Sequence, residues 1–298
     1  MNILITGGTG FIGRQLVALL STHHQITVLT RNPTRAAENL GSRPEFIFSL
    51  EQLNDLNDYD LIINLAGEPI VQKRWTTEHK NTLCKSRWDI TAKLSELILN
   101  SSEPPSCFIS ASAIGYYGRQ NATSISEGSP PTPEFTHHLC HEWERLALLA
   151  QNDNTRVCIL RIGVVLGCKG GALEKMLPLF KYGLGGPISS GKQGMSWIHE
   201  RDLLRLIQFL MSHQDCRGVF NATAPNPVSN RELSKTLGRV LKRPAFIPMP
   251  SFVLKMLMGE MSDLLTEGQY VSPQKAMGAG FEFNYPTLNN ALTQILGT

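Results

Sequence analysis

The stretch MNILITGGTGFIGR, residues 1–14, joins a short β-branched run to three spaced glycines and the start of a helical pattern. Residues 2–6, NILIT, have the composition of a strand that is buried on both faces of a parallel sheet. Gly7, Gly10 and Gly13 follow, and apolar residues then recur at helical spacing through residues 14–20. The stretch therefore predicts a strand, a glycine-rich turn and a helix in direct succession.

Glycines at these positions are typical of a turn that binds a dinucleotide. The first permits a tight turn, the middle one lets backbone N–H groups approach a pyrophosphate, and Gly13 lets the helix lie close to the strand. The string Gly8-x-Gly10-x-x-Gly13 fits the same spacing, so both registers are open. The start of the helix adds unpaired N–H donors and a positive dipole end, which suit an anion. The alternative is an ordinary strand–helix turn with surplus glycine.

The composition is that of an ordinary soluble globular protein. Of the 298 residues, 42% are hydrophobic and 18% charged, and this length corresponds to about two domains. A net charge of +3 is too small to indicate nucleic acid or an anionic membrane as a partner. No apolar run approaches the ~18 residues of a membrane helix, and the N-terminus lacks an export leader. The six cysteines show no CxxC spacing, so we expect reduced thiols and a cytoplasmic location.

The end of the second expected strand, residues 25–30, indicates which nicotinamide dinucleotide the turn prefers. NAD-specific sites place Asp or Glu there to bind the ribose 2′-hydroxyl. This sequence has Thr30 and Arg31, with Arg35 one turn later. A guanidinium fork matches a phosphate, so the position favours NADP(H). Arg31 as a solvated loop cation is the alternative.

Strand-like and helix-like segments alternate through most of the chain. Further strands are expected at 46–48, 60–67, 107–110 and 156–162, and helices at 75–100, 135–151, 230–241 and 251–258. This alternation implies right-handed crossovers and an α/β fold with a doubly wound parallel sheet. We expect residues 1–168 to form a Rossmann domain, to which 196–223 return. Residues 169–195 and 224–298 would form a smaller, mostly helical domain on the substrate side.

Several motifs together resemble those of the extended short-chain dehydrogenase/reductases. They are TGGTGFIG (6–13), NLAG (64–67), the serine-rich strand end before YYG (116–118), LRIGVVLG (160–167) and SWIHERDL (196–203). Other segments resemble an epimerase-like subfamily, 39U, of the NAD(P)-dependent epimerase/dehydratase family. These are GEPI (67–70), the pair Arg74-Trp75, GLGGPISSGKQ (183–193), and a C-terminal module with RPAFIPMPSFVLK (243–255), LLTEGQYVSPQKA (264–276) and GFEFNYPTL (280–288).

The resemblance implies an NADP(H)-binding Rossmann domain and a small-molecule substrate held against the C-terminal domain. We expect a monomer or a homodimer. The implied cofactor contacts are Gly7, Gly8, Thr9, Gly10, Phe11, Ile12 and Gly13 at the pyrophosphate, Thr30 and Arg31 at the 2′-phosphate, Leu65, Ala66 and Gly67 near the ribose, with Arg87 and Val165 as further contacts. Arg87 also fits a surface cation of its helix.

The sequence departs from the family at its proton-transfer residues. Catalytic members carry a Tyr-x-x-x-Lys pair, in which the lysine lowers the phenol's pKa from about 10 so that it can move a proton. Here the corresponding positions are Thr136 and Cys140, which cannot do that chemistry. The usual serine or threonine partner is Ser112 if Tyr116 is the family tyrosine, but Ala113 stands there if Tyr117 is. The standard machinery is missing or rebuilt.

The candidate catalytic residues are therefore Ser112, Tyr116 and Tyr117, at a strand end that faces the ligand crevice. Packing of the two aromatic rings over the cofactor is the alternative. The sequence HHLCH (137–141) places two histidines four residues apart on a helix, but without a zincin glutamate or CxxC we predict no metal site. One of these histidines could instead replace the missing acid or base.

Two other motifs are interpreted as structural. The segment 186–193 nearly matches the motif of a phosphate-binding loop. However, Gln193 stands where the motif requires a hydroxyl residue for Mg²⁺, and no buried strand precedes the segment. His199 and Asp202 are expected to cap the helix that follows them. Two functions then remain open: an NADP(H)-dependent oxidoreductase or epimerase-like enzyme acting on a small polar or sugar-like substrate, and a protein that binds or senses NADP(H) with weak or no catalysis.

Overall fold

A seven-stranded parallel sheet forms the centre of the computed structural model, which describes residues 1–120 and 122–297. The strand order is β11-β7-β5-β4-β1-β2-β3, so it reverses at β1. Ligands of such sheets bind outside the carboxyl ends of the strands where the order reverses. The strands are β1 (Asn2–Thr6), β2 (Gln25–Leu29), β3 (Glu45–Ile47), β4 (Leu61–Asn64), β5 (Cys107–Ala113), β7 (Arg156–Ile162) and β11 (Gly218–Ala222).

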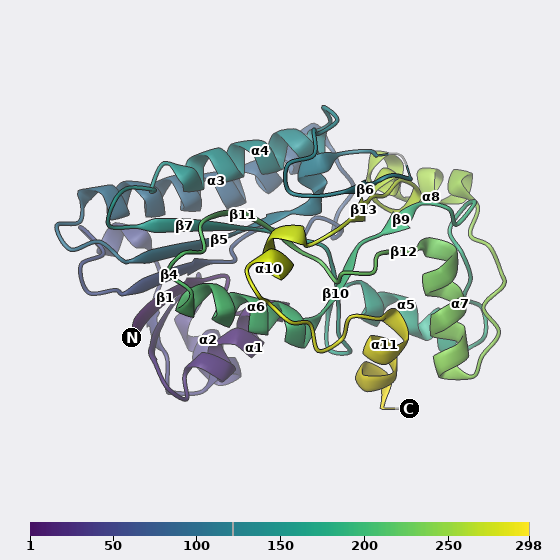
Figure 1. The fold of residues 1–298 in the computed structure, drawn as a ribbon, viewed down its shortest axis with the longest axis horizontal. Coiled ribbons are helices and arrows are strands. Elements are labelled where there is room, and N and C mark those ends of the chain that lie inside the picture. The colour runs from purple at the N-terminus through teal and green to yellow at the C-terminus, as the bar shows by residue number, and fades with distance from the viewer. Residues whose placement is uncertain (121, 298) are drawn as a thin grey trace.

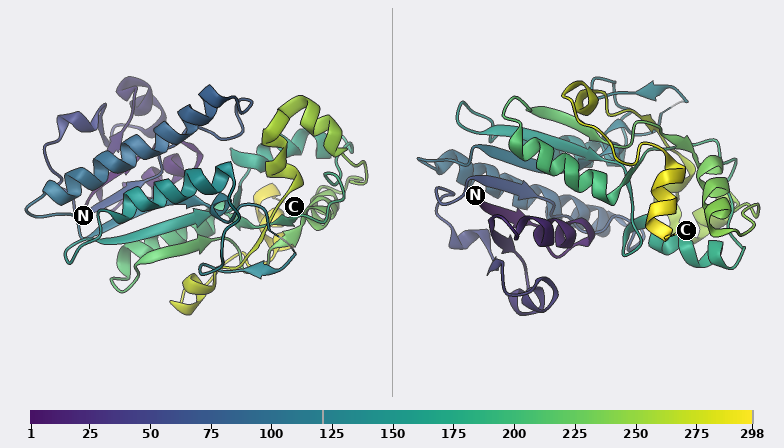
Figure 2. Two further views of the ribbon diagram at one scale, coloured as in Figure 1. Left: turned by 90° about the horizontal axis from the view of Figure 1, so that it is seen from above. Right: turned by 60° about the horizontal axis from the view of Figure 1, so that its bottom comes forward.

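Helices cover both faces of the sheet, which confirms the doubly wound α/β fold (Figures 1 and 2). The helices α1 (Phe11–Leu20), α2 (Pro33–Leu40) and α6 (Glu200–Ser212) cover one face, and α3 (Thr77–Asn100) and α4 (Phe135–Leu148) cover the other. Side chains of β1 alternate between the two faces: Ile3 and Ile5 pack in the core with α1 and α6, whereas Leu4 packs in the core with α3. Burial on both faces explains why this strand is uniformly apolar.

The C-terminal part is smaller and mostly helical, as expected. Its helices are α5 (Gly171–Lys181), α7 (Asn230–Leu241), α8 (Ser251–Met258), α9 (Asp263–Thr266), α10 (Gln274–Gly278) and α11 (Leu288–Leu296). Short strand pairs join it to the rest: β8 (Val164–Leu166) with β10 (Trp197–His199), β9 (Gly194–Met195) with β12 (Val228–Ser229), and β6 (Ser124–Ile125) with β13 (Tyr270–Val271). Three 3₁₀ turns complete the described elements: Leu50–Gln52, Ile114–Tyr117 and Gly259–Ser262.

The C-terminal part has its own core, in which α5, α7 and α11 pack around the fully buried Trp197. Strand β11 pairs with β7 at the edge of the main sheet, so the chain returns to that sheet between the two stretches of the C-terminal part. The exact domain boundaries stay a prediction.

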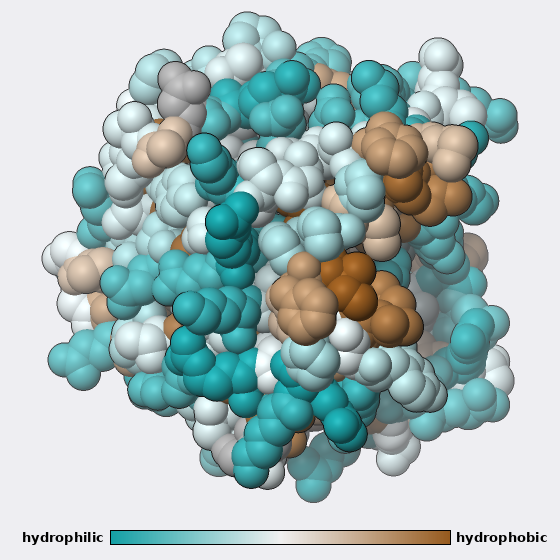
Figure 3. Space-filling model, turned by 90° about the vertical axis from the view of Figure 1, so that its right-hand side faces the viewer, coloured by the Kyte–Doolittle hydropathy of each residue, from teal (hydrophilic) through white to brown (hydrophobic). Residues whose placement is uncertain are grey.

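The surface of the C-terminal part carries clusters of apolar side chains among hydrophilic ones (Figure 3). Its strongly exposed apolar residues are Tyr182, Phe246, Phe252, Met256 and Leu257. Within the described ranges, no helix combines the length and the apolar character needed to cross a bilayer.

Candidate functional site

The turn between β1 and α1 depends on glycine at its first and last positions. Gly7 has a φ of +70°, and a Cβ on it would lie 2.8 Å from the Ala66 nitrogen at the end of β4. A Cβ on Gly13 would lie 2.7 Å from the Gly8 Cα and still closer to the Gly7 carbonyl. Backbone atoms cannot rotate away, so side chains at these two positions would push β1, β4 and α1 apart.

Gly10 differs, because the protein itself leaves room beside it. Its backbone is extended (φ −74°, ψ 178°), and the Gly7 carbonyl, at 3.2 Å, is the one atom within 4 Å of an added Cβ. Gly10 is the N-cap of α1 and provides no side-chain acceptor for the first N–H groups of the helix. An exposed helix start that lacks a capping side chain suits an anion, and the missing Cβ lets that anion come close to the backbone.

The other residues of the turn have distinct surroundings. Gly8 is buried, and a Cβ there would lie 2.8 Å from Val28, so packing against β2 explains this glycine. Thr9 is exposed, and Ile12 is half-buried against the core. The Phe11 ring lies against the loop before α5, where a Cβ on Gly170 would be 2.6 Å from it.

Val165 lies close to the same region. A Cβ on Gly171 would lie 3.1 Å from the Val165 carbonyl and 3.2 Å from the Phe11 ring. The structure therefore brings the start of α1 and the segment after β7 close together.

The end of β2 presents an exposed cation. Thr30 is half-buried, and Arg31 is exposed and forms no ion pair or side-chain hydrogen bond with a described residue. Asn32 caps α2 by accepting a hydrogen bond from the Arg35 nitrogen at 3.0 Å, so this cap fixes the backbone just after Arg31. The guanidinium of Arg31 remains open to an outside anion.

Asn64, which the sequence analysis did not single out, positions the end of β4. Its Oδ1 accepts a hydrogen bond from Thr6 at 2.6 Å and one from the Ala66 nitrogen at 3.3 Å. Its Nδ2 donates to Thr91 on α3 at 2.8 Å and to Ser110 at 3.3 Å. This buried network ties three strands and a helix together beneath Leu65 and Ala66. The signal in the sequence is a polar residue within the apolar run LIIN.

Arg87 is a buried cation rather than a surface one. Its guanidinium donates to the Glu68 carbonyl and to the Leu83 carbonyl, each at 2.9 Å. A Cβ on Gly67 would lie 2.9 Å from the Arg87 Cζ, so this glycine makes room for the guanidinium. Burial lowers the pKa of Arg87, and no carboxylate of the described chain forms an ion pair with it. The loop after β4 is thus held by a positive charge that is not neutralised locally.

At the carboxyl end of β5, Ser112 belongs to a buried ion-pair network. Its hydroxyl donates to the Glu144 Oε1 at 2.6 Å, and Arg161 binds both carboxylate oxygens of Glu144 at 2.9 and 2.8 Å. Arg161 and Glu144 are only 4% and 6% exposed. The hydroxyl of Ser112 is therefore committed to a carboxylate, which makes Ser112 a positioning residue in this arrangement.

The two tyrosines lie in different environments. Tyr117 is fully buried, and its hydroxyl donates to Asn221 at 2.7 Å and accepts from Arg161 at 3.0 Å. Burial raises the pKa of Tyr117, so this phenol stays protonated and structural. Tyr116 is half-buried, its hydroxyl has no hydrogen bond to a described residue, and the Arg161 guanidinium lies 3.3 Å from its ring centroid. Of the two tyrosines, Tyr116 is therefore the more accessible.

Thr136 and Cys140, at the positions of the family pair, pack beneath this turn. A Cβ on Gly115 would lie 3.2 Å from Thr136 and 3.7 Å from the Cys140 sulfur, and both side chains are buried. Burial raises the pKa of Cys140 to about 12, so its thiol stays neutral. These positions now serve packing.

His137 is one of the titratable groups around Tyr116, beside Arg161, Tyr117 and His141. Its Nδ1 lies 2.7 Å from the Tyr116 carbonyl, and its ring lies 5.0 Å from the Tyr116 ring. A carbonyl can only accept, so Nδ1 donates to it, and in a neutral imidazole Nε2 is then the acceptor. His141 lies 5.4 Å from His137, whereas His138 lies against Trp88 instead. Across the described residues, no three His, Cys, Asp or Glu side chains gather in a way that could hold a metal ion.

Of the two residues expected to cap α6, one does so. His199 Nδ1 accepts from the Arg201 nitrogen at 3.0 Å, which confirms it as the N-cap. The expectation for Asp202 was wrong: its buried carboxylate accepts from the nitrogens of Asn284 at 3.0 Å and Tyr285 at 2.8 Å. Asp202 therefore holds the segment before α11 against α6.

The chain matches known proteins along its whole length. Residues 3–222 match the model of the NAD dependent epimerase/dehydratase family, and residues 249–295 match a domain of unknown function, DUF1731. An Arabidopsis thaliana protein named "Epimerase family protein SDR39U1 homolog, chloroplastic" is 42% identical, covering 99% of this chain and 87% of that protein. "Epimerase family protein YfhF" of Bacillus subtilis is 36% identical over 99% of this chain and 98% of its own.

Solved structures share the fold. The human epimerase family protein SDR39U1 (isoform 2), crystallised with NADPH, superposes with a TM-score of 0.92 at 35% identity, covering 100% of both chains. A UDP-glucuronic acid 4-epimerase from Bacillus cereus superposes with a TM-score of 0.79 at 20% identity, covering 100% of this chain and 98% of its own. At 20% identity, the match to the Bacillus cereus protein supports only a shared fold.

Proposed function

The chain belongs to the NAD dependent epimerase/dehydratase family, and from this membership and its site we propose that it is an NADP(H)-binding, epimerase-like oxidoreductase. The epimerase resemblance seen in its sequence motifs is confirmed by the match over residues 3–222. The observation that carries the cofactor proposal is the open, uncapped start of α1 at Gly10, with the unpaired Arg31 at the end of the adjacent strand. The human relative crystallised with NADPH supports the same assignment.

The residues proposed to hold the cofactor divide into three groups. Backbone N–H groups of the turn from Gly7 to Gly13 would bind the pyrophosphate, and the Arg31 guanidinium would bind the 2′-phosphate. The segment Leu65–Gly67, fixed by Asn64 and Arg87, would lie along the ribose, with Val165 on the opposite wall. The bound nicotinamide would supply or accept the hydride.

Exchanging Arg31 for aspartate tests the cofactor proposal. A carboxylate would repel a 2′-phosphate but accept a ribose hydroxyl, so we expect Arg31→Asp to raise the Kd for NADPH at least tenfold relative to the Kd for NADH. Both constants are measured by nicotinamide fluorescence with purified protein. Arg243→Asp, the same charge change at an exposed site after α7, is the matched control and should leave the ratio unchanged. An unchanged ratio in Arg31→Asp would refute the phosphate contact.

For the chemical step we propose Tyr116 as the proton-transfer group and His137 as the base beside it. Support comes from the unbonded Tyr116 hydroxyl, the aromatic contact between the two rings, and the tautomer that leaves the His137 Nε2 free to accept. Tyr117 and Ser112 would position this pair through Arg161 and Glu144. The substrate would be small and polar or sugar-like, held between the sheet and the C-terminal part.

The second candidate function is a protein that binds or senses NADP(H) without turnover. The packing of Thr136 and Cys140 where catalytic members carry tyrosine and lysine favours it. Incubating NADPH and protein with a panel of carbonyl compounds and nucleotide sugars separates the two functions. Either NADPH oxidation or conversion of a nucleotide sugar that is lost in Tyr116→Phe supports the enzyme, and NADPH binding with neither reaction supports the sensor. The cytoplasmic location stays a prediction, since the Arabidopsis relative is named chloroplastic.

A further inference from the structure

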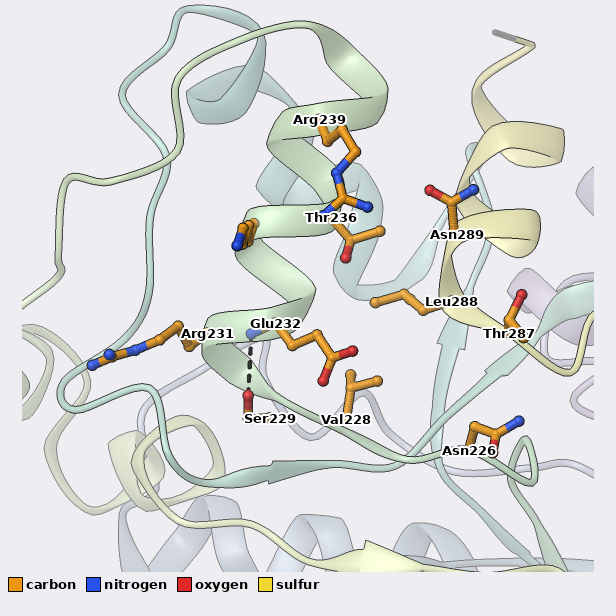
Figure 4. Close-up of a pocket in the computed structure, with 11 residues that line it drawn as sticks. Asn226, Val228, Ser229, Arg231, Glu232, Thr236, Arg239, Thr287, Leu288 and Asn289 are labelled. Atoms are coloured by element: carbon orange, nitrogen blue, oxygen red, sulfur yellow. Dashed lines mark hydrogen bonds between the residues drawn. The ribbon is translucent and has the colours of Figure 1, made fainter.

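A groove lies between α7 and α11, in the C-terminal part of the molecule, formed by residues that none of the roles above uses. Its volume is about 570 Å³. One wall is α7, the other is the start of α11, and the strand β12 leads into it (Figure 4). The lining residues are Asn226, Val228, Ser229, Arg231, Glu232, Lys235, Thr236, Arg239, Thr287, Leu288 and Asn289.

Along α7, the wall of the groove carries an acidic residue, then a hydroxyl, then a basic residue. Glu232, Thr236 and Arg239 lie on the side of α7 that faces α11, whereas Arg231 points the other way and donates to the Ser190 carbonyl at 2.8 Å (Figure 4). The eight residues from Glu232 to Arg239 span about 10 Å along the helix axis. The groove therefore has an acidic lower end and a basic upper end, with a hydroxyl between them.

Among the described residues, the side chains of Glu232, Thr236 and Arg239 form no hydrogen bond or ion pair. Thr236 is only 6% exposed, yet its hydroxyl forms no hydrogen bond with a described residue. Arg239, Lys235 and Glu232 form no ion pair anywhere in residues 1–120 or 122–297. The Thr236 hydroxyl lines the groove with its hydrogen-bonding capacity unused, so a ligand or a water in the groove can bond to it.

The opposite wall and the floor complete the set. Asn289 faces Arg239 from α11, and its amide forms no hydrogen bond with a described residue (Figure 4). Thr287, the N-cap of α11, gives no side-chain cap to that helix. Val228 and Leu288 extend toward the space between the helices and make its floor apolar. A polar rim above an apolar floor is typical of small-molecule sites.

From this arrangement we propose that the α7–α11 groove binds a small phosphomonoester that carries hydroxyl groups, such as a sugar phosphate. Among the lining residues, Arg231, Lys235 and Arg239 are cations and Glu232 is an anion, so the surroundings of the groove are net positive, which favours an anion. A guanidinium fork beside a hydroxyl and an amide matches the several oxygens of a phosphoryl group. Glu232 and the Asn226 Oδ1 can accept from hydroxyls of the same ligand, and the apolar floor takes its carbon skeleton. The length of about 10 Å suits a sugar phosphate and is too short for a dinucleotide.

Isothermal titration calorimetry with ribose 5-phosphate tests the proposal. The full-length protein is kept saturated with NADPH, so that the glycine turn cannot take up the phosphate. We expect saturable binding by the wild type, a Kd at least tenfold higher in Arg239→Gln, and a several-fold higher Kd in Thr236→Val, which removes only the hydroxyl. Arg243→Gln, an exposed arginine just beyond α7 and outside the groove, is the control and should bind as the wild type does.

Each outcome decides a part of the proposal. Absence of saturable heat at millimolar ribose 5-phosphate would overturn it, as would wild-type affinity in Arg239→Gln. Inorganic phosphate binding as tightly as ribose 5-phosphate would remove the assignment of Glu232 and Asn226 to the sugar hydroxyls. Binding of ribose alone with the same Kd would remove the phosphoryl site. Circular dichroism of each variant confirms that it is folded, and Thr236→Val keeps the test available should Arg239→Gln fold poorly.

Discussion

Replacing Gly10 and Gly13 by alanine, one at a time, separates a glycine kept for a ligand from a glycine kept for packing. At Gly10 the backbone is extended (φ −74°, ψ 178°), a conformation that alanine adopts freely. An added methyl group would meet the Gly7 carbonyl at 3.2 Å and nothing else within 4 Å. Alanine is a poorer N-cap than glycine by about 0.5–1 kcal/mol. We expect Gly10→Ala to lower the free energy of unfolding by no more than about 1 kcal/mol.

Gly13→Ala should behave in the opposite way. Inside a helix, alanine gains about 1 kcal/mol over glycine from propensity alone. Here, however, the new Cβ would lie 2.7 Å from the Gly8 Cα and closer still to the Gly7 carbonyl, so α1 must move away from the turn. Overpacking of this kind costs about 1–3 kcal/mol or more, and contact with backbone puts it at the upper end. We expect a net loss of about 2 kcal/mol in the free energy of unfolding.

The measurements are urea unfolding for stability and NADPH fluorescence for binding. Gly10→Ala should unfold nearly as the wild type does but bind NADPH at least tenfold more weakly, because its methyl group occupies the approach of the pyrophosphate. Gly13→Ala should show the larger loss of stability. Wild-type NADPH affinity in Gly10→Ala would refute the role given to the open position, and wild-type stability in Gly13→Ala would refute the packing argument.

Three further predictions concern the buried polar groups. Tyr117→Phe should lower the free energy of unfolding by about 1–3 kcal/mol, because it leaves the partners of the hydroxyl unsatisfied. Tyr116→Phe should change the free energy of unfolding by less than about 0.5 kcal/mol but reduce turnover. Urea unfolding and an activity assay on both variants check these expectations. Glu144→Gln should cost about 3–5 kcal/mol, since it leaves the Arg161 guanidinium buried without a carboxylate, and a wild-type urea midpoint would contradict this. Burial lowers the pKa of His199 below its usual 6.5, so the unfolded chain binds more protons and stability should fall as the pH drops below about 6.5. His199→Asn keeps an acceptor for the helix start, and its Tm should depend less on pH between 7.5 and 5.5 than that of the wild type.

The sequence was most informative where local geometry and chemistry coincide. The strand, turn and helix of residues 1–20, the positions of the sheet's main strands and the helices α7 and α8 follow from apolar periodicity and the positions of Gly and Pro, because these features act over a few neighbouring residues. The loss of the family's Tyr-x-x-x-Lys pair at Thr136 and Cys140 was also visible in the sequence, because it depends only on which residue types stand at a known spacing.

The buried networks could not be predicted in the same way. Asn64 pairs with Thr6 and Thr91, which lie 58 and 27 residues away, and Tyr117 pairs with Asn221, 104 residues away. Asn64 and Asn221 are polar residues in otherwise apolar strands, which signals a partner but not its identity. The carboxylate of Asp202 illustrates the limit: its place before a helix predicted a cap, yet it binds backbone amides 82 and 83 residues further along.

By itself, the sequence determined the parallel sheet, the glycine turn and the cation at the end of β2, because backbone sterics and residue charge fix these locally. Only the tertiary structure showed that Tyr117 is fully buried whereas Tyr116 is half-buried. It also showed that the Ser112 hydroxyl is hydrogen-bonded to Glu144 and that α7 and α11 enclose a polar groove. The physical reason is that burial and hydrogen-bond partners are set by segments distant in the chain, and these determine which of several similar side chains can meet a ligand.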